Sequence, residues 1–138
     1  MANEITVNSS LTVQNGSLVY QSRPTAFTAT QEVAIGPVVG SILVSTAGTS
    51  VSLASLATPG LCRIQNLDGT NIVEVGLSDG VYFYPLLDLL PGETYVVRLC
   101  RHLGRREVAP GTGSTTPLSL MLRADDADCY VLVEAFNK

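Results

Sequence analysis

The chain has 138 residues and a formal net charge of −4, and only 14% of its residues are charged against 46% that are hydrophobic. This length fits one domain with a core of its own. The acidic balance argues against a general nucleic-acid binder, which would show a basic excess. No run approaches the ~18 apolar residues of a membrane span, and the start of the chain lacks the pattern of a signal peptide.

The shortage of charge is itself informative, because an ordinary soluble domain carries about 25% charged residues. Ser, Thr, Asn and Gly take the place of the missing charges in this chain. A neutral polar surface loses less free energy on desolvation than a charged one. The composition therefore suits a protein that buries much of its surface against other subunits.

Residues 1–37 predict a hairpin or an extended arm. Ile5 and Val7 alternate with polar residues, and the same period of two continues on both sides of Asn15 and Gly16. An Asn-Gly pair between alternating segments is a strong hairpin signal. Pro24 and Pro37 then interrupt the pattern, which favours an edge strand or an arm over a central strand.

The middle of the chain predicts further short strands separated by turns. The segment 61–77 reads as a hairpin, with Asp68 and Gly69 at its tip. Residues 55–57 could form one helical turn, and we expect 101–116 to be an irregular loop because it is rich in Gly, Pro, Ser and Thr. The remaining strands are expected at 38–45, 49–53, 81–90, 94–100, 118–122 and 129–136.

About ten short strands, with turn signals every eight to twelve residues, predict an all-β fold. We expect a single β-domain over 1–138, an antiparallel sandwich or barrel that is jelly-roll-like or immunoglobulin-like, with an extended N-terminal arm. The patterning does not choose between these topologies or fix the order of the strands.

Residues for catalysis or cofactor binding are scarce, so we expect a protein that is not an enzyme and has no cofactor or metal. His102 is the only histidine, and no nucleophile motif accompanies it. The acidic turn at 125–128 lacks the spacing of a calcium loop and reads as solvated. Three cysteines, Cys62, Cys100 and Cys129, lie in apolar runs without metal spacing and read as reduced core thiols.

Arginines and tyrosines are the candidates for contacts with other subunits. Arg98, Arg101, Arg105 and Arg106 are half of the eight Lys and Arg residues. They read either as the solvated flank of a loop or as a patch that pairs with an acidic surface, for which Arg is well suited. The run 82–84 is aromatic throughout, so Tyr82 and Tyr84 cannot lie on the same face as the residue between them.

Five segments carry a resemblance to a known group of proteins: ANEITV at 2–7, LTVQNGSL at 11–18, TPGLCRIQNLDGTNIVEVG at 58–76, FYPL at 83–86 and LPGE at 90–93. With these segments the chain resembles small structural proteins of tailed bacteriophages, and in its size it is similar to head decoration (cement) proteins. The resemblance covers 1–98, and the basic segment 101–116 departs from it.

The resemblance implies a virion protein, made in the host cytoplasm, that binds the major capsid protein on the outer capsid surface as a homotrimer. It implies neither nucleic-acid nor membrane partners. The segments 1–10, with Ile5 and Val7, and 22–37 would then act as arms that add to a neighbour's sheet. Two alternatives stay open: a tail, neck or head-fibre component, and a carbohydrate-binding module for host attachment.

Overall fold

The protein is described by a computed structural model that covers residues 5–31, 33–100, 103 and 117–138. The chain divides into two compact units, Met1–Glu32 and Val33–Lys138. Every sheet in the described residues is antiparallel, and no helix is present there. The all-β prediction is therefore confirmed, and the helical turn expected at 55–57 is wrong for these residues, since the chain makes only a turn at 54–55.

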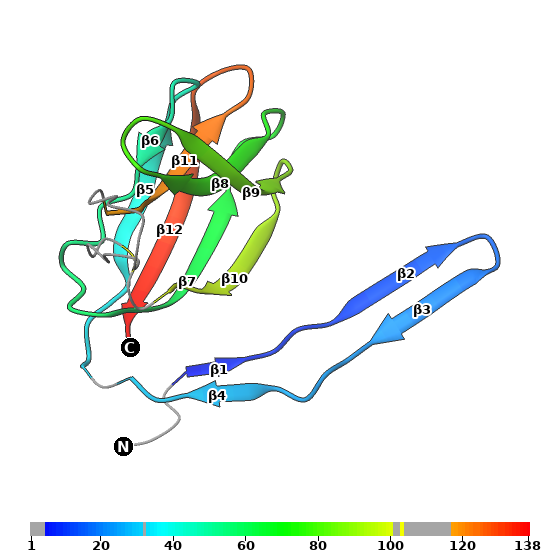
Figure 1. Cartoon of the computed structure of the whole chain (residues 1–138). Helices are drawn as coiled ribbons and strands as arrows, with labels where there is room; N and C mark the ends of the chain where they lie inside the picture. Colours follow the sequence, from blue (N-terminus) through cyan, green and yellow to red (C-terminus); the bar gives the residue numbers. More distant parts are fainter. Residues whose placement is uncertain (1–4, 32, 101–102, 104–116) are drawn as a thin grey trace, which may run out of the picture. The chain divides into compact units, whose positions relative to one another are not determined.

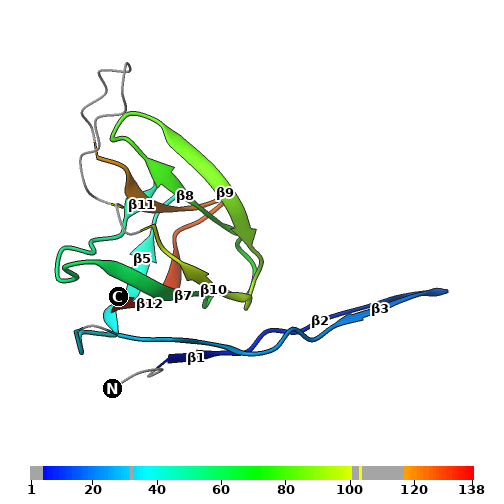
Figure 2. The same ribbon diagram turned by 60° about the horizontal axis from the view of Figure 1, so that its bottom comes forward.

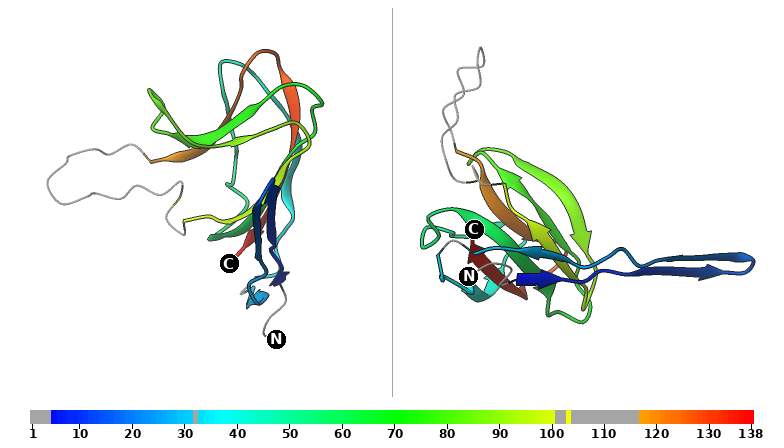
Figure 3. Two further views of the ribbon diagram at one scale, coloured as in Figure 1. Left: turned by 90° about the vertical axis from the view of Figure 1, so that its right-hand side faces the viewer. Right: turned by 90° about the horizontal axis from the view of Figure 1, so that it is seen from below.

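The first unit contains two pairs of strands, which we call the ribbon (residues 5–31). Strand β1 (Ile5–Val7) pairs with β4 (Phe27–Ala29), and β2 (Leu11–Asn15) pairs with β3 (Leu18–Ser22). Figure 3 shows β2 and β3 running beside each other as a two-stranded ribbon. Gly16, at φ +55, takes the left-handed conformation that the predicted Asn-Gly turn requires.

The second unit, the sandwich, contains two four-stranded sheets that form separate layers in Figures 1 and 2. One sheet has the order β10-β7-β12-β5, and the other has the order β6-β11-β8-β9. The strands of the first sheet are β5 (Val38–Val44), β7 (Pro59–Asn66), β10 (Thr94–Arg98) and β12 (Cys129–Asn137). Those of the second are β6 (Thr49–Ser50), β8 (Val73–Ser78), β9 (Phe83–Leu89) and β11 (Ser119–Ala124).

The core lies between these two sheets and follows from the alternation along each strand. Along β12 every second side chain is buried, as expected for a strand with one face against a core. The fully or almost fully buried apolar side chains include Val44, Cys62, Ile64, Val131, Val133 and Ala135 from one sheet and Val73, Val75, Leu89, Leu120, Leu122 and Ala124 from the other.

The hairpin expected over 61–77 is wrong, although both of its strands exist. Strand β7 pairs with β10 and β12, whereas β8 pairs with β9 and β11 in the opposite sheet. Residues 67–72 therefore cross from one layer to the other. Likewise, β11 and β12 flank the acidic turn at 125–128 but belong to different sheets.

Asn66 fixes the crossing at the end of β7 and is completely buried. Its Nδ2 donates to the carbonyl of Asn71 at 2.8 Å and to that of Leu89 at 3.1 Å, while its Oδ1 accepts from the N–H of Asp68 at 3.0 Å. Leu89 belongs to the opposite sheet. One amide thus joins the two layers. It also supplies hydrogen bonds to backbone groups that lose their hydrogen bonds to water on folding.

Candidate functional site

The ribbon presents one apolar face that its own unit leaves largely open. Opposite residues in an antiparallel pair share a face, and the register places Val13 opposite Tyr20. Leu11 and Leu18 lie on that same face by alternation, and Leu11, Leu18 and Tyr20 are all more than half exposed. We call these four residues the ribbon face. An isolated two-stranded hairpin is marginally stable in water, so this face favours a partner.

The opposite side of the same pair of strands is mainly polar. It carries Thr12, Gln14 and Gln21, with Val19 as its single large apolar side chain. Arg23 is the only charged residue in 5–31. The ribbon is thus amphipathic but nearly uncharged, which suits burial against protein.

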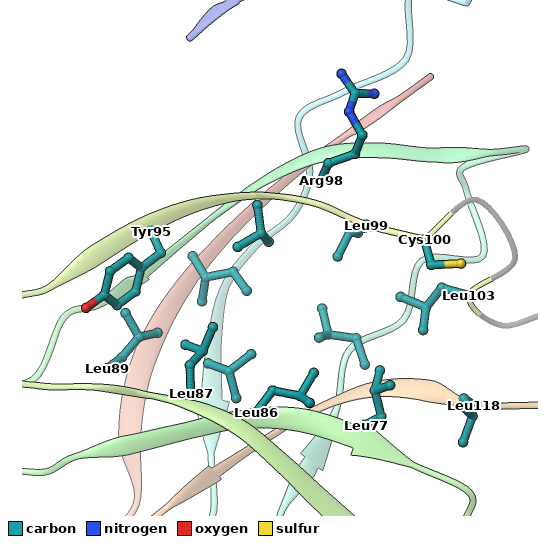
Figure 4. Close-up of a pocket in the computed structure, with 14 residues that line it drawn as sticks. Leu77, Leu86, Leu87, Leu89, Tyr95, Arg98, Leu99, Cys100, Leu103 and Leu118 are labelled. Atoms are coloured by element: carbon teal, nitrogen blue, oxygen red, sulfur yellow. The ribbon is translucent and has the colours of Figure 1, made fainter. Parts of the chain in front are cut away.

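A second apolar surface is a groove between the edges of the two sheets of the sandwich. The groove opens where β9 and β10 diverge, and its volume is about 400 Å³. Figure 4 shows aliphatic side chains from β8 and β9 on one wall, with Tyr95 and Leu99 on the opposite wall. Its lining includes Leu77, Leu86, Leu87, Leu99, Leu103 and Leu118. Such a lining supplies almost no polar group to orient a small polar substrate.

The turn between β9 and β10 is held by Glu93. Its Oε2 accepts from the N–H of Leu90 at 2.9 Å and from the hydroxyl of Tyr95 at 3.4 Å. Arg98, at the end of β10, is exposed and points away from the groove in Figure 4. The lining of the groove is therefore apolar apart from Arg98, whose guanidinium points outward.

Two exposed tyrosines flank the start of β9. Tyr82 is 65% exposed and Tyr84 is 48% exposed, whereas Phe83 between them lies under the guanidinium of Arg123, 4.8 Å from its Cζ. The Tyr84 hydroxyl donates to Oδ2 of Asp79 at 3.1 Å. Hydrogen bonds from the N–H groups of Tyr82 and Val81 lower the pKa of Asp79, and the bond to Asp79 raises the pKa of Tyr84.

The structure places the other sequence-predicted contact residues in different units. Ile5 and Val7 lie half-buried in β1 of the ribbon, opposite Ala29 and Phe27. Arg98 lies on the edge strand β10 of the sandwich. The remaining members of the basic cluster, Arg101, Arg105 and Arg106, fall outside the described residues together with His102.

The acidic turn at 125–128 serves the loops of the sandwich. Asp125 Oδ1 accepts from the N–H of Ile72 at 2.9 Å, and Asp128 Oδ1 accepts from that of Thr46 at 3.3 Å. No group of three or more His, Cys, Asp or Glu residues in the described part of the chain could hold a metal ion. These carboxylates therefore act as caps for backbone donors from two other loops.

All three cysteines are free thiols, but the expectation that all three are core residues is wrong for one of them. Cys62 and Cys129 are buried, whereas Cys100 is exposed at the rim of the groove. Cys100 lies two residues beyond Arg98, the last residue of β10. Desolvation by burial, followed by the charge of Glu134, raises the pKa of Cys62 to about 12.

Sequence reasoning missed the groove because each of its aliphatic residues reads as a core residue. Leu77, Leu86 and Leu118 lie in separate apolar runs. Only the strand order, which puts β9 and β10 at neighbouring edges of opposite sheets, leaves these side chains facing an open space. The sequence holds one weaker signal of the groove. Leu86, next to Pro85, interrupts the period-two alternation of side chains along its strand.

Comparison with protein-family models, with curated proteins and with solved structures finds no match. The described residues contain no helix long and apolar enough to cross a membrane. The site is thus defined by its own geometry: an apolar ribbon face and an apolar groove, both suited to contacts with protein.

Proposed function

We propose that this chain is a structural protein of a tailed-bacteriophage particle that binds the outer capsid surface and stabilises the capsid by bridging capsomers. In this proposal it acts as a homotrimer, contacts the major capsid protein and carries no catalytic activity. The observation that supports it most is the ribbon face, an apolar surface with a single charged residue in the whole ribbon. Such a surface favours stable burial against another subunit.

The division of the chain into two units supports a clip-like role. The sandwich has its own core, and the ribbon makes its contacts mostly within itself. A protein that ties neighbouring capsomers together needs a rigid domain and a separate segment that binds a neighbouring subunit. Repetition over many symmetric sites would turn modest contacts into a large total stabilisation. The extended arm and the Arg98, Arg101, Arg105 and Arg106 patch remain predictions within this proposal.

Copy number in the purified particle tests the proposal. Quantitative mass spectrometry should give a ratio of this chain to the major capsid protein near one to one. A ratio of a few per cent would instead support the alternative of a tail, neck or head-fibre component. Absence of the chain from the particle would refute a virion role altogether.

Attachment gives a second test of the same proposal. Deletion of residues 1–10 removes β1 and leaves the sandwich strands intact. We expect this variant to cosediment poorly with undecorated capsids while its sandwich keeps its cooperative unfolding. If the shortened chain decorates capsids as well as the full chain does, the segment 1–10 has no role in attachment.

The exposed pair Tyr82 and Tyr84 supports a second candidate, a carbohydrate-binding module. Aromatic rings beside the carboxylate of Asp79 are a chemistry that sugar sites use. A glycan array would test it, with Tyr82→Ala and Tyr84→Ala expected to abolish any saturable binding. Lack of saturable binding by the unmodified chain would exclude this candidate.

A further inference from the structure

Among the described residues the two sheets of the sandwich have four edge strands, and three of them carry features that discourage pairing with another strand. Strand β5 contains Val39 and Gly40, both with positive φ, and β6 has only two residues. Strand β9 contains Pro85, which lacks an N–H, and the charged Asp88. Proline, charge, short length and irregular backbone are the usual protections of a sheet edge.

Strand β10 is the exception. It is a regular five-residue strand without proline or glycine, and its one charged residue, Arg98, stands at its end. Among the described residues it pairs only with β7. The groove lies directly beside this edge, and Tyr95, Val97 and Leu99 line it. A strand added to β10 would therefore gain main-chain hydrogen bonds and could place alternate side chains in the groove.

The ribbon has the properties that such an added strand needs. Strands β2 and β3 each have five residues, the length of β10. Leu18 and Tyr20 lie on one face of β3, so alternate residues of that strand are apolar. The groove has a volume of about 400 Å³, which leaves room for apolar side chains of an added strand.

Charge also favours the ribbon as the occupant. Three acidic side chains, Asp79, Asp88 and Glu93, lie in or beside β9 and the turn to β10, against one basic side chain, Arg98, at the end of β10. The ribbon contributes a single positive charge, Arg23, and no acidic residue within 5–31. The chain's segment 104–116 offers only one large aliphatic side chain, Val108, and so has little with which to fill the groove.

We propose that the ribbon of one copy adds to β10 of a second copy and inserts its apolar face into that copy's groove. This inference rests on the proposed self-association of the chain but not on capsid binding. Each copy has one ribbon and one groove, so the contact is head-to-tail and closes into a ring when the rotation between copies allows it. A trimer is one such ring. This contact between copies buries both apolar surfaces of the chain, the ribbon face and the groove.

Four full-chain variants test the proposal by size-exclusion chromatography with light scattering. Leu18→Asp alters the ribbon face, and Val19→Asp makes the same change on the opposite side of the same strand. Leu86→Asp alters the rim of the groove, and Val81→Asp is its control, at an exposed position outside the groove. All four positions are exposed, from 57% for Leu18 to 79% for Val81, so each variant should keep a cooperative thermal unfolding transition of the sandwich.

We expect the unmodified chain and both controls to be oligomers, and both Leu18→Asp and Leu86→Asp to be monomers. A carboxylate placed in an apolar groove should weaken association about 100-fold or more. An equal mixture of Leu18→Asp and Leu86→Asp should then form a dimer, because the intact ribbon of one variant can enter the intact groove of the other. Neither variant alone can do so.

Several results would overturn the inference. These are a monomeric unmodified chain, an oligomer that survives Leu18→Asp, equal losses for Leu18→Asp and its Val19→Asp control, or a mixture that forms no dimer. An oligomer that survives Leu18→Asp but no longer binds capsids would show that the ribbon contacts the capsid protein, so the proposed function would stand without this inference. Exchange between copies of a chain that is absent from the particle would leave the inference standing and refute the proposed function.

Discussion

Replacement of the buried amide of Asn66 should destabilise the sandwich severely. Asn66→Leu keeps a side chain of similar size but removes three hydrogen bonds, to Asp68, Asn71 and Leu89. An unsatisfied buried polar group costs about 1–3 kcal/mol, and only the contact with Leu89 is fully buried. With about 1 kcal/mol for each of the two part-buried bonds in addition, we expect a loss of about 3–5 kcal/mol in the free energy of unfolding.

Urea titration followed by circular dichroism measures this loss, and a thermal scan should show Tm lowered by about 10–25 °C. Gln65→Leu is the matched control, because Gln65 is the neighbouring residue on the outer face of the same strand and is half-buried. We expect it to change stability by less than about 0.5 kcal/mol.

A second replacement tests the direction of the hydrogen bonds. Asn66→Asp has nearly the same shape but turns a donor into a carboxylate oxygen facing two carbonyl oxygens, so it should be destabilising at pH 7 and partly recover when the carboxyl is protonated. A loss below about 1 kcal/mol for Asn66→Leu would refute the view that this amide joins the two sheets.

Three further predictions concern the sandwich. A Cβ on Gly76 would clash with the carbonyl oxygen of Tyr84, so Gly76→Ala should cost about 1–3 kcal/mol in urea titration, whereas Gly69→Ala, with open space around it, should be nearly neutral. At pH 8 a thiol reagent should modify one cysteine rapidly, and Cys100→Ser should abolish this phase, because the other two thiols are buried. Rapid modification of a second thiol would contradict the burial. The pKa of Cys62 is about 12 against an ordinary value of 9.0, so between these values the unfolded thiol ionises and the folded one stays protonated. The free energy of unfolding should therefore fall as pH rises from 9 to 12. The fall should be steeper than in Cys62→Ala by about 1.4 kcal/mol per pH unit. An equal dependence of stability on pH in the two proteins would refute the raised pKa of Cys62.

The sequence predicted the strands of the sandwich well and their pairing poorly. Period-two alternation reports which face of a strand is buried, and it located both β7 and β8. It does not report the neighbouring strand, because any strand with the same alternation can lie alongside. Asp68 and Gly69 looked like the tip of a hairpin, but Asp68 instead accepts from Thr70 and Asn71 within the crossing loop.

The two surfaces of the candidate site differ in how far the sequence could reveal them. Alternation around Asn15 and Gly16 predicted the ribbon strands, and so also which side chains share a face. Exposure of that face could not be predicted, because an apolar side chain in a strand is normally covered by a second layer. The groove depends on strand order in both sheets, which is set by pairings between residues as distant in the chain as Leu77 and Leu120.

The position of β12 has a consequence for the synthesis of this protein. The strand ends at Asn137, yet it lies between β5 and β7 in the middle of its sheet. Until β12 has been synthesised, β5 has no partner in this sheet and β7 can pair only with β10, so the first sheet stays incomplete. Folding dominated by such distant pairings is slow, and unpaired strands can meet those of neighbouring chains. Where many copies are made at once, the rate at which β12 joins its sheet would then limit how many chains reach the folded state.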